Sequence, residues 1–127
     1  MKTPYILAIL TVCLLGVLPA SAQVFTNAGA IFSAQAGAIV HINGSALVTG
    51  GETTFADRAE LRVNGNFSVD AGLVIFNAAS TGVVTNDCFI GTAGELRRLG
   101  TGTLFLNRLT RNKGLIINDA IIEYGTP

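Results

Sequence analysis

A stretch near the middle of the chain returns further along at a fixed spacing, and this recurrence constrains the fold more than any other feature. Residues 37–48 read GAIVHINGSALV, and residues 58–69 read RAELRVNGNFSV. One asparagine marks the same place in successive units, at Asn43, Asn64, Asn86 and Asn107. A fixed period of this length is typical of solenoid proteins. The sequence therefore predicts that about 21 residues make one coil.

Apolar and mixed positions alternate before each asparagine. The positions one and three residues before it are mostly aliphatic: Ile42, Val63, Thr85 and Leu106, and Val40, Leu61, Val83 and Leu104. The position between them is mixed: His41, Arg62, Val84 and Phe105. Alternation with period two predicts short strands that have one face in a hydrophobic core.

A series of glycines runs out of phase with the asparagines and marks a second set of corners. These are Gly29, Gly51, Gly72, Gly94 and Gly114. Three of them precede strongly apolar stretches, at residues 30–32, 73–76 and 115–117. Each unit therefore carries at least two short strands. The predicted fold is all-β: a β-solenoid, parallel β-helix-like, with about 21 residues per coil and roughly five coils.

The start of the chain, residues 1–22, has a different character from the rest. Lys2 is followed by an apolar stretch over residues 5–18 and by the small residues Ala20-Ser-Ala22, a pattern typical of a secretory signal peptide. We expect residues 1–22 to be this signal and residues 23–127 to be the solenoid domain. A lipoprotein signal ending at Cys13 is the alternative, but Val12 is larger than the residue expected before a lipidated cysteine.

The composition of the chain argues against two classes of function, nucleic-acid binding and membrane spanning. Half of the 127 residues are apolar, which is enough for one ordered core, and eight basic residues balance eight acidic ones. Nucleic-acid binding would ask for a strongly basic surface, so no nucleic-acid partner is expected. The apolar stretch in the leader is too short for a membrane span. We expect a secreted or cell-surface protein with no membrane span in the mature chain.

Sequence motifs for catalysis are sparse. His41 is the only histidine, and its outward position beside Arg62 of the next coil favours an exposed ladder residue over a catalytic one. The chain has no G-x-S-x-G, H-E-x-x-H, C-x-x-C or P-loop motif. Glu52 and Glu95 take equivalent places, but Leu73 lies in the coil between them. We predict no catalytic, cofactor-binding or metal-binding residue and no enzymatic activity.

Two features have both a functional and a structural interpretation. Cys88 is the one cysteine after the leader; a reactive or interchain thiol is the first interpretation, and a small half-buried residue beside a corner, in a column with Ser45, Asn66 and Leu109, is the favoured one. Five basic residues fall within one coil: Arg97, Arg98, Arg108, Arg111 and Lys113. This patch could attract an acidic polysaccharide, although a solvated, solubilising corner is the favoured interpretation.

The asparagine column predicts a structural ladder. Side-chain amides stacked on successive coils can hydrogen-bond along the solenoid axis, and asparagine also suits tight corners. At the other end of the chain, residues 121–124 read as a strand of a further coil with no polar cap after it. The solenoid is therefore expected to be open at its C-terminal end.

The low-charge coils over residues 36–44 and 61–68 resemble the N-terminal β-solenoid region of Bacteroidetes-type secreted and surface repeat proteins. That resemblance implies a passenger of the type IX secretion route, with a sorting domain further along a longer protein, and a right-handed coil. It raises the expectation of an exported protein and says little about activity.

These observations favour a structural or adhesive β-solenoid segment of an exported protein. The partners expected are a cell-surface glycan, further coils of the same protein, or a second copy bound through the open end. The alternative is the front part of a polysaccharide-degrading β-helix enzyme with its catalytic coils beyond residue 127. Ice binding would need one outward threonine column, and the threonines at 53, 54, 101 and 103 do not form one.

Overall fold

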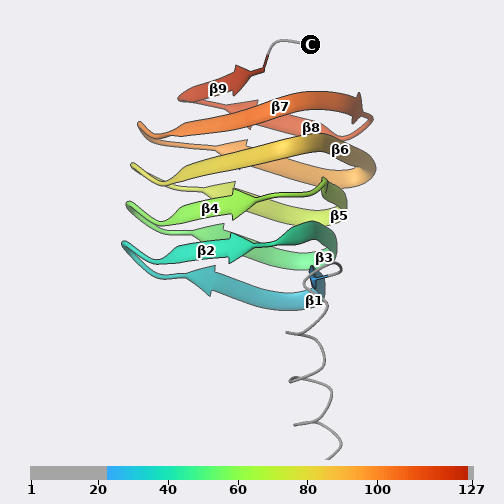
Figure 1. The fold of residues 1–127 in the computed structure, drawn as a ribbon, viewed down its shortest axis with the longest axis horizontal. Coiled ribbons are helices and arrows are strands. Elements are labelled where there is room, and N and C mark those ends of the chain that lie inside the picture. Colours follow the sequence, from blue (N-terminus) through green and yellow to red (C-terminus); the bar gives the residue numbers. More distant parts are fainter. Residues whose placement is uncertain (1–22, 126–127) are drawn as a thin grey trace, which may run out of the picture.

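The computed structural model describes residues 23–125, which form nine strands and no helix (Figure 1). The expected signal peptide over residues 1–22 lies outside the described residues. The strands are β1 Gln23–Ala34, β2 Ile39–Ile42, β3 Gly44–Phe55, β4 Glu60–Val63, β5 Phe67–Phe76, β6 Thr81–Arg98, β7 Thr103–Asn112, β8 Leu115–Asn118 and β9 Ile121–Tyr124.

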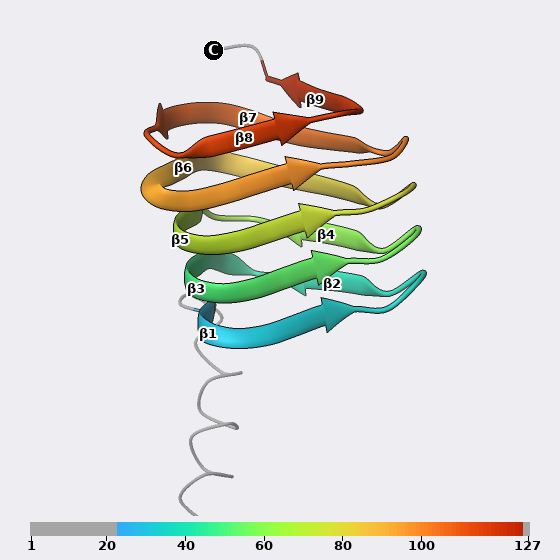
Figure 2. The ribbon, with the colours of Figure 1, turned by 180° about the vertical axis from the view of Figure 1, so that it is seen from behind.

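Every strand pairing in the fold is parallel, and each strand pairs with the strand one coil away. One side of the stack runs β1, β3, β5 and β6, and the other runs β2, β4, β6, β7 and β9, while β8 pairs with β6. About five coils stack along one axis, as both ribbon views show (Figures 1 and 2). The prediction of a β-solenoid, with the coil length expected from the repeat, is confirmed.

The core consists of columns of inward side chains, one from each coil. Val48, Val69 and Ile90 form one column and are fully buried. Phe55 and Phe76 form another, with their rings stacked at a centroid distance of 4.7 Å. The inward side chains of successive coils stack in these columns, so burial of apolar surface stabilises the stack as a whole.

The glycine series marks the corners where the long strands bend, as predicted. Gly29, Gly51 and Gly72 have φ values of 142°, 71° and 90°, a range that L-residues with side chains rarely adopt. A Cβ on Gly72 would lie 2.7 Å from the carbonyl carbon of Gly50 in the preceding coil. Glycine is needed there both for the backbone conformation and for the close approach of successive coils.

The predicted register is wrong by one residue in the third coil. Val63 pairs with Val84, and Leu61 pairs with Gly82, so Thr85 and Val83 do not stand in the two inward columns. Val84 is fully buried, whereas Val83 is 36% exposed. Asn64 and Asn86 are 22 residues apart, one more than the coil length of about 21, and the prediction placed this extra residue before Asn86. In the structure the strands stay paired at a separation of 21 residues as far as Val69 and Ile90.

The extra residue of this coil lies further along, at a corner. Val69 pairs with Ile90 and Ala71 pairs with Ala93, so Asp70 alone faces the two residues 91–92. Such an insertion is a β-bulge, which bends the strand locally and is frequent beside functional sites. Register shifts also occur at the corresponding corners of the two preceding strand pairs, but there the pairing returns to its earlier offset at Ile31 and Glu52. At residues 91–92, the irregular corner, the extra residue is kept, because the new offset continues to Arg98.

Candidate functional site

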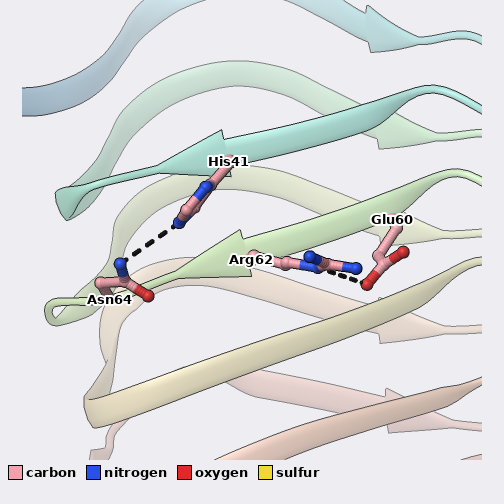
Figure 3. A network of polar contacts seen from close by, with 4 residues as sticks. All are labelled: His41, Glu60, Arg62 and Asn64. Atoms are coloured by element: carbon pink, nitrogen blue, oxygen red, sulfur yellow. Dashed lines mark hydrogen bonds and ion pairs between the residues drawn. The ribbon is translucent and has the colours of Figure 1, made fainter.

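The outward face of β2 and β4 carries a small polar network (Figure 3). His41 pairs with Arg62 across the two strands, and both side chains are exposed. Arg62 Nε donates to Glu60 Oε1 at 2.6 Å, and His41 Nε2 lies 3.2 Å from Asn64 Nδ2. The predicted position of His41 in an exposed ladder is confirmed.

The asparagine ladder has one rung. Asn64 Nδ2 donates to Asn43 Oδ1 at 3.2 Å, as predicted. The next position in the column is Thr85, and its hydroxyl donates to the carbonyl oxygen of Val63 at 3.1 Å. The prediction that Asn86 extends the ladder is wrong, because the register places it one residue past the column.

Four carboxylates lie in ion pairs with arginines. The pairs are Asp57 with Arg58, Glu60 with Arg62, Glu95 with Arg97 and Asp87 with Arg108. The hydrogen bond from Arg108 Nε, 2.6 Å long, lowers the pKa of Asp87 from its ordinary value. Among the described residues, no group of three or more His, Cys, Asp or Glu side chains could hold a metal ion.

Two further sequence predictions concern columns, and they have different outcomes. Glu52 pairs with Leu73 and Leu73 with Glu95, so the two glutamates are separated as predicted. Cys88, however, stands in the inward column with Phe67 and Leu109 instead of beside Asn66. Its thiol is fully buried, and this desolvation raises the pKa of Cys88 to about 12. The half-buried position predicted for Cys88 is therefore wrong, and burial keeps the thiol protonated.

The predicted basic patch is not one surface. Arg98 pairs with Phe76 in an inward column and is fully buried, because its long side chain takes the place that phenylalanine occupies in the two preceding coils. Arg97 and Arg108 are neutralised by Glu95 and Asp87. The prediction that Arg98 belongs to an exposed cluster is wrong.

The buried guanidinium of Arg98 instead forms hydrogen bonds to two turns. Its Nη1 donates to the carbonyl oxygen of Ser80 at 2.5 Å and to the Ser80 hydroxyl at 3.0 Å. Its Nη2 donates to the carbonyl oxygens of Ala78, at 2.5 Å, and of Leu99. Burial lowers the pKa of Arg98 from its ordinary value. These bonds satisfy backbone acceptors inside the stack, which is a structural role.

The two remaining basic residues line a surface groove of about 350 Å³ at the irregular corner. Ser68 and Asp70 contribute from β5, residues 89–92 from β6, and Arg111 and Lys113 from β7 and the turn after it. A second cavity, among the inward side chains of the first two coils, measures about 10 Å³ and can hold at most one water molecule. The groove is therefore the candidate functional site.

A second irregularity places Arg111 in the groove. Cys88 pairs with Leu109 but Phe89 pairs with Arg111, so Thr110 is an extra residue in β7. Arg111 thereby joins the outward column of Ser68 and Phe89. Arg111 and Lys113 were predicted from the sequence as members of a basic patch, whereas Asp70, Phe89 and Thr92 were not predicted as site residues. The one signal for them was the irregular spacing between coils.

Comparisons with protein-family models, with curated proteins and with solved structures found no match. Within residues 23–125, the chain forms no helix long and apolar enough to cross a membrane.

Proposed function

We propose that this chain is a structural and adhesive β-solenoid segment of an exported protein. The observation that carries the proposal is the stack of parallel coils with an unbroken core, because it holds the outward side chains of successive coils in fixed columns. Parallel strands lie about 4.8 Å apart, so side chains in one column form a rigid, closely spaced array. Such arrays suit a stalk or a surface that contacts a polymer.

Export is supported by the sequence of residues 1–22, which has the positive start, the apolar stretch and the small-residue end of a signal peptide. Location at the cell surface or in the medium follows from this proposal. The resemblance to Bacteroidetes-type surface repeat proteins points in the same direction.

A role without catalysis is supported by the state of three carboxylates. Glu60, Asp87 and Glu95 each accept a hydrogen bond from an arginine, with donor–acceptor distances of 2.5–2.6 Å. General acid or base chemistry needs a carboxyl group free to exchange a proton with a substrate. Glu60 and Glu95 each fix an arginine two residues along the same strand, and Asp87 fixes Arg108 of the next coil.

Fractionation of the native host tests this proposal. An antibody raised against the solenoid should label intact cells or the culture medium, and mass spectrometry of the product should show that its sequence begins near Gln23. A second experiment coats beads with the purified protein and measures their retention on host envelope polysaccharide. Retention of the chain in the cytoplasm with residues 1–22 still attached would contradict the proposal.

A further inference from the structure

We propose that the groove at the irregular corner binds an acidic sugar, that is, a saccharide unit carrying a carboxylate or a sulfate group. This inference deepens the adhesive function proposed above and rests on it for its biological setting only. The residues that carry it are Asp70, Phe89, Arg111 and Lys113. The volume of the groove, about 350 Å³, falls within the range of about 300 to 1,000 Å³ that is usual for small-ligand sites.

The two cations of the groove are available to a ligand. The ion pairs among the described residues involve Arg58, Arg62, Arg97 and Arg108, and neither Arg111 nor Lys113 belongs to one of them. Both residues are exposed. An arginine beside a lysine can bind an anionic group with charge-assisted hydrogen bonds, the arginine through its planar fork. This pair predicts an anionic group on the ligand.

The carboxylate of Asp70 repels anions, so a simple anion does not suit the whole groove. It is an exposed carboxylate on the β5 side of the groove, with the cations on the β7 side. An ionised carboxylate only accepts hydrogen bonds, and it repels other anions. A ligand that suits the whole groove must therefore offer hydroxyl donors to Asp70 and an anionic group to the cations. A uronic acid or a sulfated sugar has both.

Phe89 provides an apolar surface between these charged sides. Its side chain lies in the outward column between Ser68 and Arg111 and is half-buried. Binding sites of this size combine apolar and aromatic surface with a few placed polar groups. The C–H face of a sugar ring can pack on such a surface while the hydroxyls of Ser68 and Thr92 contact its rim.

The groove exists because two extra residues coincide there. Asp70 faces residues 91–92, and Thr110 moves Arg111 opposite Phe89. At the equivalent outward position of the preceding coils stand Thr26 and Leu47, which carry no charge. Sites formed by bulges re-aim side chains without disturbing the core columns. The fold therefore accommodates this site while the inward residues Val69 and Ile90 beside it stay paired.

Calorimetric titration of the purified full chain with a tetrasaccharide of galacturonic acid tests the proposal. The control ligand is the same tetrasaccharide as its methyl ester, which has the same rings without the charge. We expect saturable binding of the acid and none of the ester at the same concentration. Equal binding of both ligands, or binding of neither this uronate nor a sulfated galactan oligosaccharide, would overturn the proposal.

Matched variants separate a built site from general attraction between charges. Arg111→Gln and Lys113→Gln should each weaken binding roughly 10-fold, because each removes a charge-assisted hydrogen bond. Arg58→Gln makes the same change in net charge at an exposed position outside the groove lining and should leave the Kd within a factor of two. Equal weakening by Arg58→Gln would overturn the proposal.

Asp70→Asn distinguishes most clearly between a sugar-binding site and a groove that only attracts polyanions. If the groove only attracts polyanions, removal of this negative charge must tighten binding. If Asp70 accepts a hydroxyl hydrogen bond from the sugar, the substitution replaces a charge-assisted acceptor with a weaker neutral one, and we expect this loss to exceed the gain from the lost repulsion. We expect weakening at an unchanged melting temperature. Because these measurements use purified protein, their failure would leave the export proposal standing, and a cytoplasmic location would not affect them.

Discussion

The corner at Gly72 and the corner at residues 91–92 are one coil apart, yet the second keeps one residue more than the first. At Gly72 the backbone has positive φ, and a side chain would collide with Gly50 in the preceding coil. At residues 91–92 the coils also approach closely, since a Cβ on Gly91 would lie 2.6 Å from the carbonyl oxygen of Asp70, but the corner keeps one extra residue and a groove lies beside it. Both corners therefore pack coil against coil, and the net inserted residue at the second corner coincides with the groove.

The largest expected effect distinguishes a core phenylalanine from the groove phenylalanine. Phe76→Ala removes a fully buried ring stacked on Phe55 and should lower the free energy of unfolding by about 3–5 kcal/mol. Phe89→Ala, at a half-buried position, should cost about 1 kcal/mol. Urea unfolding measures both. Similar costs for the two variants would break the distinction between core and groove.

Gly72→Ala should be the next largest effect. The substitution combines strain at φ 90° with a contact between Cβ and the Gly50 backbone, and should cost about 1–3 kcal/mol. Gly37→Ala is the control, because Gly37 also has positive φ but its Cβ would meet nothing within 4 Å. The difference between the two melting temperatures isolates the packing of coil on coil. If Gly37→Ala lowered the melting temperature as much as Gly72→Ala, the close contact between Gly72 and Gly50 would contribute nothing to the loss of stability.

The decrease in the free energy of unfolding at alkaline pH tests whether the Cys88 thiol, next to the irregular corner, is buried. The Cys88 thiol has an ordinary pKa of 9.0, which burial raises to about 12 in the folded chain. The folded protein therefore keeps a proton that the unfolded chain loses, and the contribution is complete below pH 9. Between pH 9 and 12 the free energy of unfolding should fall by about 1.4 kcal/mol per pH unit. Cys88→Ala should lack this component, and a parallel decline in both proteins would contradict the buried position.

The smallest expected effect concerns the amide ladder. Asn64→Leu removes the hydrogen bond to Asn43 and should lower stability by about 0.5–1 kcal/mol without changing saccharide binding. Asn86→Leu changes the same residue type at the position that lies outside the ladder and should have no measurable effect. Thermal melts of the two variants suffice. A larger cost at Asn86 would restore the register expected from the asparagine spacing.

Much of the fold could be predicted from the sequence because a stacked coil repeats its constraints. The inward Val48 and Val69, and the corner Gly51 and Gly72, recur at the coil period, and repetition makes each assignment support the next. The position of Cys88 could not be predicted in this way. One inserted residue leaves the period almost unchanged, and only hydrogen-bonded pairing of strands decides on which side of Asn86 it lies.

The groove was less predictable than the fold for the same physical reason. Arg111 and Lys113 stood out as charges, but Arg98 could not be distinguished from them, because an arginine stem can fill an apolar column when its guanidinium reaches backbone carbonyls. Asp70 and Phe89 carry no motif. They come together only through the bulges, which break the repeat on which the sequence analysis relied.

A disulfide cross-link tests the irregular corner most directly. Ala71 and Ala93 are paired across β5 and β6, whereas a coil without the inserted residue would pair Ala71 with Thr92. Paired residues on neighbouring strands point their side chains to the same face, whereas residues one place out of register point them to opposite faces, and a disulfide needs Cβ atoms that approach each other. The variant with cysteines at 71 and 93 should form the intramolecular disulfide rapidly in mild oxidant, as read by peptide mass mapping. Preferential closure of the variant with cysteines at 71 and 92 would contradict the bulge, and with it the account of the groove.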